Sequence, residues 1–246
     1  MGVDSGLPDF RGRDGFWRAY PALWNQGLSF EDMANPARFA EHPKLAWGFY
    51  GHRLKLYRET VPHEGFAILR KWADRIRHGA FVFTSNVDGQ FQKSGFPADR
   101  VHERHGSIHR LQCLEGCSTD TWSADEFHPL VNEKTSQLES PMPRCPRCGA
   151  LARPNILMFG DWGWVDVPYE KKGERLAAWI SSVSKPVIVE LGAGRALPTV
   201  RRFSERNARE RLIRINPREP ITNPMHGVGL TGEAAATIKL LELAVG

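Results

Sequence analysis

The sequence predicts an α/β protein with a parallel sheet and a small metal-binding module inserted into it. Short apolar runs at 81–84, 186–191 and 212–215 are typical of strands buried on both faces. The chain's only four cysteines come as two close pairs between the first two of these runs. With 246 residues, the chain is long enough for a large domain carrying a small one.

The predicted helices connect these strands. Residues 36–59 carry apolar side chains at helical spacing, and a second helix is expected after Pro62. Residues 198–210 are predicted to form a helix between two strands, which makes a βαβ unit, and a last helix is expected over 233–243. In such a layout, ligand sites lie at the carboxyl ends of the strands.

Composition excludes several classes of protein. No run approaches 18 consecutive apolar residues, so no membrane span is expected. The net charge of +5 is mild, and the basic clusters at 70–77 and 201–214 alternate with apolar residues, which favours solvated helix faces over a nucleic-acid surface. Few cysteines and no recognisable signal peptide favour a cytoplasmic protein.

The cysteine pairs predict a structural zinc ribbon. Three residues separate Cys113 from Cys117, and two separate Cys145 from Cys148. Four thiolates close the tetrahedral shell of one Zn²⁺ ion and leave no position for water, so the site would stabilise the fold without doing chemistry. Disulfides and a redox dithiol are the alternatives, but a doubled pair of this spacing favours zinc.

Three polar stretches, at 4–12, 84–89 and 102–109, are unusual for purely structural segments. Asn86 and Asp88 follow a predicted strand at alternate positions. His105 precedes Gly-Ser just before the first cysteine pair, and a neutral imidazole there could accept a proton from a hydroxyl. The residues alone leave a general base and a structural histidine equally open.

Together these stretches make the chain resemble the sirtuin family, the NAD-dependent protein lysine deacylases. The matching segments occur in family order: 6–12, 84–89, 105–107, the four cysteines, 153–161, the strand into Gly192, and 215–216. The resemblance implies a Rossmann-like large domain and a small domain of two parts. The large domain would comprise 1–35, 60–109 and 154–246, with a helical module at 36–59 and the zinc ribbon at 110–153.

The resemblance also implies a reaction. His105 would act as general base on a ribose hydroxyl of NAD, after the acyl-lysine carbonyl oxygen has displaced nicotinamide. The products would be free lysine, nicotinamide and O-acyl-ADP-ribose. A monomer acting on acyl-lysine proteins, with no specific nucleic acid and no membrane as partner, is expected.

The family's binding residues carry over by position. Those implied to bind NAD are Gly2, Asp9, Phe10, Arg11, Ser85, Asn86, Asp88, Gly192 and Asn216. Phe10 would shield the reactive centre, and Asn86 and Asp88 would bind nicotinamide and its ribose. Met158, Phe159 and Gly160 would pair with the substrate main chain as an added strand.

Tyr50 and Arg53 stand three apart on a predicted helix and so share a face. In the sirtuin branch that removes succinyl and malonyl groups, a Tyr-x-x-Arg at this place binds the acyl carboxylate. The resemblance therefore extends the expected substrates beyond acetyl-lysine. A surface arginine beside a core tyrosine is the purely structural alternative.

The chain also departs from the family pattern. Residues 1–6 align with the middle of a phosphate-binding Gly-Ala-Gly-x-Ser loop, so the first strand and three loop residues are missing. We expect that the natural protein begins upstream; a variant lacking part of its phosphate site is the alternative. Ser85 replaces the usual glutamine, and Gly192-Ala193-Gly194 replaces Gly-Thr-Ser.

Two other functions stay open at this point. An NAD-consuming ADP-ribosyltransferase or NAD hydrolase would share the cofactor site and differ in its acceptor. A non-catalytic zinc-ribbon module with a decayed NAD site would bind protein or nucleic acid instead.

Overall fold

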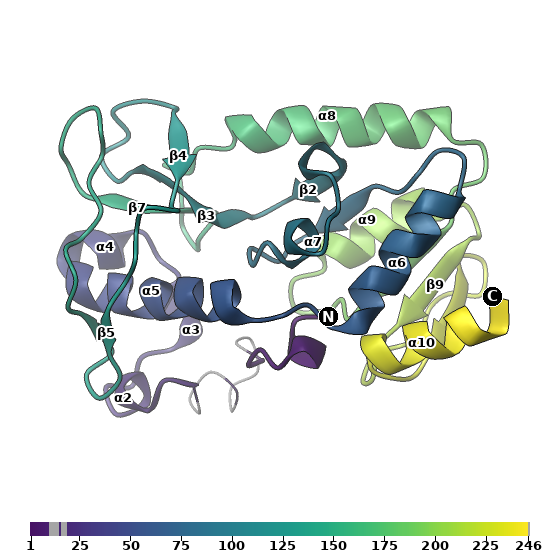
Figure 1. Cartoon of the computed structure of the whole chain (residues 1–246), viewed down its shortest axis with the longest axis horizontal. Helices are drawn as coiled ribbons and strands as arrows, with labels where there is room; N and C mark the ends of the chain where they lie inside the picture. The colour runs from purple at the N-terminus through teal and green to yellow at the C-terminus, as the bar shows by residue number, and fades with distance from the viewer. Residues whose placement is uncertain (10–14, 16–18, 246) are drawn as a thin grey trace.

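The computed structural model describes residues 1–9, 15 and 19–245, with the side chain of residue 245 left out. The molecule is elongated, with one lobe around α5 and β3 and another around α6, α9 and α10 (Figure 1). The amino terminus lies between the two lobes, and the carboxyl terminus lies at the far end of the second (Figure 1).

Both lobes contain helices. Those of the first lobe are α2 (Pro21–Trp24), α3 (Phe30–Met33), α4 (Ala37–Glu41) and α5 (Pro43–Glu59), after a short 3-10 turn η1 (Val3–Ser5). Those that follow are α6 (Glu64–Arg75), α7 (Gln90–Lys93), η2 (Ala98–Arg100), α8 (Val167–Ser182), α9 (Thr199–Asn207) and α10 (Ala234–Val245). Among the described residues, every helix is too short or too polar to cross a bilayer.

The strands form four separate sheets in the described part of the chain. Two are parallel: β1 (Val82–Thr84) with β2 (Val101–Glu103), and β8 (Ile188–Leu191), β9 (Leu212–Ile215) and β10 (Gly227–Leu230) in the order β10-β9-β8. Two are antiparallel: β4 (Thr121–Ser123), β3 (Gly106–Cys113) and β7 (Ala152–Ile156) in that order, and β5 (Val131–Asn132) with β6 (Gln137–Leu138). The predicted βαβ unit is confirmed as β8-α9-β9.

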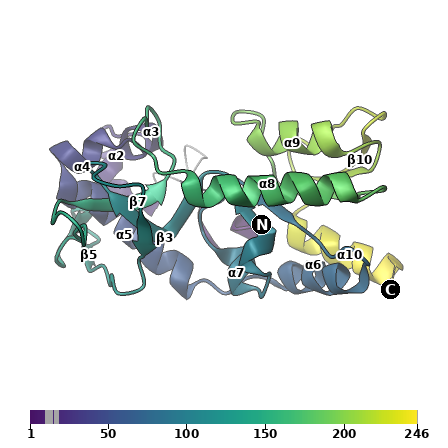
Figure 2. The ribbon, with the colours of Figure 1, turned by 90° about the horizontal axis from the view of Figure 1, so that it is seen from above.

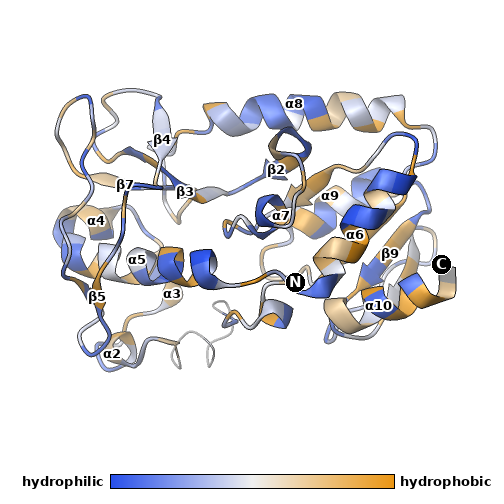
Figure 3. Cartoon of the chain, in the orientation of Figure 1, coloured by the Kyte–Doolittle hydropathy of each residue, from blue (hydrophilic) through white to orange (hydrophobic). Residues whose placement is uncertain are grey.

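Different helices cover the two faces of the β8–β10 sheet. Figure 2 shows α9 on one side of the β8–β10 sheet and α6 with α10 on the other. Ile215 and Ile238 are fully buried between β9 and α10, and Trp72 of α6 packs against them. Apolar residues colour parts of α10 and of the neighbouring sheet in Figure 3. The central strand β9 is the most buried of the three, as expected for a strand covered on both faces.

The first lobe has a larger core of its own. Trp47, Phe49 and Tyr50 of α5 are at most 1% exposed and pack with Leu111 of β3 and Leu138 of β6. The indole N–H of Trp47 also donates to the carbonyl of Ala152 in β7 (2.9 Å). Helices α2 to α5 and strands β3, β6 and β7 therefore share one hydrophobic cluster.

The prediction of one continuous helix over 36–59 is wrong. Residues 36–59 form two helices, α4 and α5, which are separated at His42. His42 lies outside the helical region (φ −135°, ψ 62°) because Pro43 follows it and disfavours helical backbone at the preceding residue. Pro43 then occupies the first turn of α5, where its missing N–H costs no hydrogen bond.

Candidate active site

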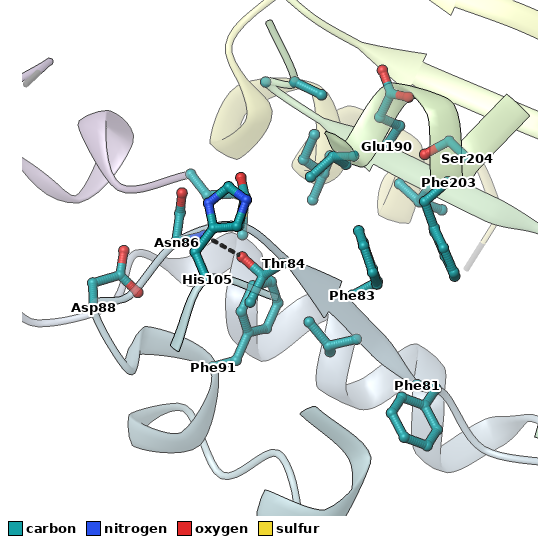
Figure 4. Close-up of a pocket in the computed structure, with 18 of the residues that line it drawn as sticks. Phe81, Phe83, Thr84, Asn86, Asp88, Phe91, His105, Glu190, Phe203 and Ser204 are labelled. Atoms are coloured by element: carbon teal, nitrogen blue, oxygen red, sulfur yellow. Dashed lines mark hydrogen bonds between the residues drawn. The ribbon is translucent and has the colours of Figure 1, made fainter. Parts of the chain in front are cut away.

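A cavity of about 890 Å³ lies between the two lobes and is bordered by strands of both parallel sheets. One end is polar and collects side chains from the loop after β1, from the turn between β2 and β3, and from α5. The other end is apolar and is lined by β1, β8, α8 and α9. Figure 4 shows His105 beside Asn86 at one end, with Phe83 and Phe203 at the other.

The loop after β1 is held by its own side chains. The Thr84 hydroxyl accepts a hydrogen bond from the Asn86 N–H (3.0 Å), and the Asp88 carboxylate accepts one from the Gln90 N–H (3.0 Å). Asn86 is exposed to the cavity, whereas Asp88 is 8% exposed. Burial raises the pKa of the Asp88 carboxyl, although the hydrogen bond from Gln90 opposes that shift.

The β2–β3 turn carries His105 to the same end of the cavity. The N–H of Arg104 donates to Thr84 O (2.8 Å), and the N–H of Ile108 donates to Val87 O (3.0 Å), so backbone bonds on both sides of His105 fasten it to the loop after β1. The carbonyl of His105 accepts from the N–H of Leu157 (3.0 Å). The half-buried imidazole lines the cavity.

Glycine is required directly after His105. Gly106 has φ +81°, and a side chain there would collide with the carbonyl of Asn155 on the paired strand β7. Asn155 is itself fully buried and satisfied by Gln112, Val165 and Tyr169 (2.7–2.9 Å). The turn that presents His105 is therefore fixed by a close backbone approach.

Tyr50 and Arg53 both line the cavity, so they share one face of α5, as their helical spacing predicts. Arg53 is 7% exposed and lies over the rings of Phe30, Phe49, Tyr50 and Tyr57, 5.2–5.7 Å from each centroid. Its Nε and Nη2 donate to the Tyr57 hydroxyl (3.1 and 2.7 Å). Burial raises the pKa of Tyr50 to about 12, so this phenol stays protonated at neutral pH.

The structure brings most of the sequence-predicted residues together. Those that line the cavity are His105, Gly2, Asp9, Ser85, Asn86, Asp88, Gly192, Tyr50, Arg53, Met158 and Phe159. Gly160 follows Phe159 as an exposed residue and is not among the lining residues. Phe10 and Arg11 lie outside the described residues.

Asn216 does not line the cavity but contacts a residue that does. Its side-chain amide donates to Ala193 O (3.1 Å), and its Oδ1 accepts from the N–H groups of Arg218 and Glu219 (3.0 and 2.9 Å). It therefore joins the turn after β8 to the turn after β9. Gly192, which opens the first of these turns, has φ +64°.

The four cysteines meet at one point beyond the end of β3. Their sulfur atoms all lie within 4.8 Å of one another, and two pairs, Cys113–Cys148 and Cys117–Cys145, are each 3.6 Å apart. Zinc–sulfur bonds of about 2.3 Å in a tetrahedron place the sulfurs roughly 3.8 Å apart, so the donor set and its spacing fit one structural zinc ion. The two close sulfur pairs, at 3.6 Å, are well beyond the roughly 2.03–2.05 Å of a disulfide bond, which favours zinc over disulfides.

Comparison with known proteins decides the family. Residues 1–172 match the Sir2 family. The chain belongs to the Sir2 family. A curated relative of this Sir2-family chain, the NAD-dependent protein deacylase of Aquifex aeolicus, is 32% identical over 161 residues, which are 65% of this chain and 58% of the relative. NAD-dependent protein deacylase 2 of Pyrobaculum aerophilum is 30% identical over 245 residues, 98% of this chain and 86% of the relative.

Solved Sir2 structures share the fold of this Sir2-family chain. A Sir2 homologue in complex with NAD matches with a TM-score of 0.68 and 23% identity, over 99% of this chain and 86% of that one. A structure described under the structural basis of sirtuin substrate affinity matches with a TM-score of 0.72 and 20% identity, over 100% and 91%. The sirtuin resemblance of the sequence and its α/β fold are thereby confirmed.

Sequence reasoning missed some residues of this Sir2 site. Tyr57 lines the cavity and accepts hydrogen bonds from Arg53. Its position four residues after Arg53 on the same helix could have predicted this contact. Phe83 and Phe203 stack across the apolar end with centroids 3.9 Å apart. Nothing local in the sequence joins a strand residue near 83 to a helix residue near 203.

Proposed function

We propose that this chain is an NAD-dependent protein lysine deacylase, with acetyl-lysine and acidic acyl-lysines such as succinyl- and malonyl-lysine as substrates. The observation that carries the proposal is the convergence of His105, Asn86 and Asp88 on one end of one cavity. The names of the matched relatives, which are NAD-dependent protein deacylases, support it.

The polar end of the cavity fits the groups of NAD. The Asn86 amide offers both a donor and an acceptor, which is what a carboxamide needs, and the Asp88 carboxylate can accept from a hydroxyl. We assign NAD contacts to Gly2, Asp9, Phe10, Arg11, Ser85, Asn86, Asp88 and Gly192, with Asn216 fixing the turn at Gly192. When bound, NAD supplies an anomeric carbon with nicotinamide as its leaving group.

The chain's own groups would then do three things. An imidazole nitrogen of His105 takes the proton of a ribose hydroxyl, which makes that oxygen a better nucleophile toward the acyl carbon. Asn86 and Asp88 orient the ring that carries this hydroxyl. Buried Val87 and Met158 line the same end and exclude bulk water, which limits simple hydrolysis.

The substrate would lie along the segment after β7. The segment would pair with an extended peptide mainly through its main-chain carbonyls, because the N–H groups of Met158 and Phe159 already donate to Asp161 and Ala34 (3.3 and 2.9 Å), and Gly160 follows them. An acyl carboxylate would meet the guanidinium of Arg53 and the protonated phenol of Tyr50. The proposal thus assigns acidic-acyl specificity to α5 and main-chain recognition to the segment after β7.

Mixing the protein with NAD and an acyl-lysine peptide tests the proposal. Release of nicotinamide that requires the peptide, together with free lysine and O-acyl-ADP-ribose detected by mass spectrometry, is the expected result. Nicotinamide release without peptide would identify an NAD hydrolase instead. ADP-ribose attached to the acceptor, with the acyl group retained, would identify an ADP-ribosyltransferase.

A further inference from the structure

Among the residues that the structure describes, the most exposed large hydrophobic one is Trp162, which is 99% exposed. It lies two positions after Gly160, the last residue of the segment proposed to pair with the substrate main chain. Tryptophan has one of the largest apolar side chains, and proteins ordinarily use it to bury area in a core or an interface. Trp162 buries almost none, so it contributes little to the stability of the isolated chain.

The backbone just before Trp162 is held in place on two sides. Asp161 is fastened to β7 by both guanidinium nitrogens of Arg153 (2.8 and 2.7 Å). The N–H of Phe159 donates to the carbonyl of Ala34 in the first lobe (2.9 Å). The segment therefore enters the turn at Trp162 from a fixed position.

The backbone after Trp162 is fixed as well. The side-chain amide of Gln112 on β3 donates to Gly163 O (2.8 Å) and accepts from the Val165 N–H (3.1 Å). The ring of Trp164 stacks on Tyr169 of α8, with centroids 5.6 Å apart and planes 17° apart. One tryptophan of this turn thus packs against the fold, and these contacts hold the other one in solvent.

A rigidly held, exposed aromatic side chain is typical of a binding surface. Little conformational freedom is lost when a partner covers it, and tryptophan is among the residues that most often dominate binding energy at interfaces. Phe159, on the same segment, is 37% exposed and lines the cavity. A single exposed apolar side chain needs no explanation. Two aromatic ones beside the carbonyls proposed to pair with substrate indicate contacts with the same peptide.

The charges around Trp162 favour an apolar partner over a basic one. The net charge of +5 disfavours a basic peptide. The neighbouring Asp161 carboxylate is already paired with Arg153, so it offers no free charge to a cation. A cation–π contact at an exposed site is weak, whereas a large apolar side chain laid on the indole removes apolar area of both groups from water.

We propose that Trp162 is a specificity-determining residue, which packs against a large apolar side chain, such as phenylalanine or leucine, within two residues of the acyl-lysine. Met158 lines the cavity and Trp162 does not, so the acyl-lysine and the partner of Trp162 are different residues of one peptide. Two residues of extended chain span roughly 7 Å, and Trp162 is itself two residues beyond the pairing segment. The inference rests on the proposed function for its ligand, but the contact requires no turnover.

Peptide binding without NAD tests the contact apart from the reaction. Fluorescent acetyl-lysine peptides of glycine and serine carry one phenylalanine at each position from two before to two after the acetyl-lysine, and anisotropy gives each Kd. For the wild-type chain, phenylalanine at one of these positions should lower the Kd at least tenfold relative to the phenylalanine-free peptide. Trp162→Ala should remove this gain and leave both the Kd of the phenylalanine-free peptide and the Tm unchanged.

Two further variants locate the effect. Trp162→Phe should keep most of the gain, because it retains an aromatic face. Leu243→Ala, which removes a 76% exposed apolar side chain from α10 in the other lobe, should keep all of it. Equal Kd values for all peptides in the wild type would overturn the proposal, as would a gain that persists in Trp162→Ala. A gain from arginine that exceeds the gain from phenylalanine would overturn the apolar partner.

Adding NAD to the same peptides separates this proposal from the proposed function. Phenylalanine-dependent binding without O-acetyl-ADP-ribose would leave the contact at Trp162 standing and reject the deacylase. Product formed at equal kcat/KM from every peptide, by the wild type and by Trp162→Ala alike, would leave the deacylase standing and reject the contact.

Discussion

Arg153 and Asp161 form a buried, two-point ion pair across the segment proposed to bind substrate. Nη1 and Nη2 of Arg153 donate to Oδ2 and Oδ1 of Asp161 at 2.8 and 2.7 Å, and the two side chains are 2% and 0% exposed. Asp161 Oδ2 also accepts from the Met158 N–H (3.3 Å). The pair therefore fixes residues 158–160 against β7.

Removing one partner of this pair should be severely destabilising. Asp161→Asn leaves the Arg153 guanidinium buried without its carboxylate, which should lower the free energy of unfolding by about 3–5 kcal/mol. Urea denaturation measures the change. Glu59→Gln is the matched control, because its pair with Lys55 is 4.0 Å long and both side chains are 63% exposed; it should shift stability by less than about 1 kcal/mol. Equal effects of the two variants would contradict the role given to Arg153–Asp161.

One zinc ion per chain should be found by elemental analysis, and Cys145→Ser should lose it. The zinc-free chain should unfold at a lower temperature and lose deacylation, because β3 runs from Gly106, next to His105, to the ligand Cys113. Thr119→Ala, an exposed change beside the first cysteine pair, should retain both zinc and activity. Full activity in the metal-free protein would show that the cysteines do not support the cavity.

Protonation of the buried His102 should make the protein less stable in acid. Burial, aided by the charges of Arg104 and Lys172, lowers the pKa of His102 from 6.5 to about 4. Between these two values the unfolded chain binds a proton that the folded chain does not, so stability is present above pH 6.5 and is lost as pH falls toward 4. His102→Phe keeps a ring against Phe83 and cannot titrate.

Urea unfolding at pH 7 and pH 4.5 measures this histidine's share. His102→Phe should reduce the acid loss of stability by about 1–2 kcal/mol. The remaining loss should persist, since burial also lowers the pKa of His109 and His63. His128→Phe, at an exposed histidine, should leave the pH dependence unchanged. An unaltered pH dependence in His102→Phe would refute the assignment.

Arg53 should set the preference for acidic acyl groups. Arg53→Met should reduce kcat/KM on succinyl-lysine peptide about 100-fold, because charge-assisted hydrogen bonds to the carboxylate are lost, and should spare deacetylation. Lys55→Met, on the same helix but 63% exposed and outside the cavity lining, should change neither reaction. Comparable losses of both activities in Arg53→Met would discard the carboxylate clamp.

Local patterns were enough to predict part of this fold. The cysteine quartet was predictable because ligand spacing is a local property, and the strands β1, β8 and β9 were predictable because each is a short, mainly apolar run. The continuous helix over 36–59 was wrong because a single X-Pro step, His42–Pro43, outweighs helical periodicity. That Tyr50 and Arg53 share a face was predictable because helical spacing fixes it, whereas the cavity that this face meets depends on the folded chain.

The rest depends on long-range partners. Strand β7 reads as polar and contains Pro154, yet all five of its residues are buried. Arg153 is tolerated there only because Asp161 meets it, and Asn155 only because Gln112 and Tyr169 do. Helix α8 was not predicted because only two of its side chains, Tyr169 and Leu176, are buried. A helix with so few buried positions has little apolar periodicity in its sequence. The apolar end of the cavity likewise needed the folded chain, since Phe83 and Phe203 come from distant segments.

The activity of His105→Ala tests the central claim most directly. Wild-type protein, His105→Ala and the exposed-site control His128→Ala are incubated with NAD and an acyl-lysine peptide, and O-acyl-ADP-ribose is measured. The account predicts product from wild type and His128→Ala, and a loss of about 10²- to 10⁴-fold in His105→Ala with its fold retained. Equal product from all three proteins, or none from wild type, would contradict it.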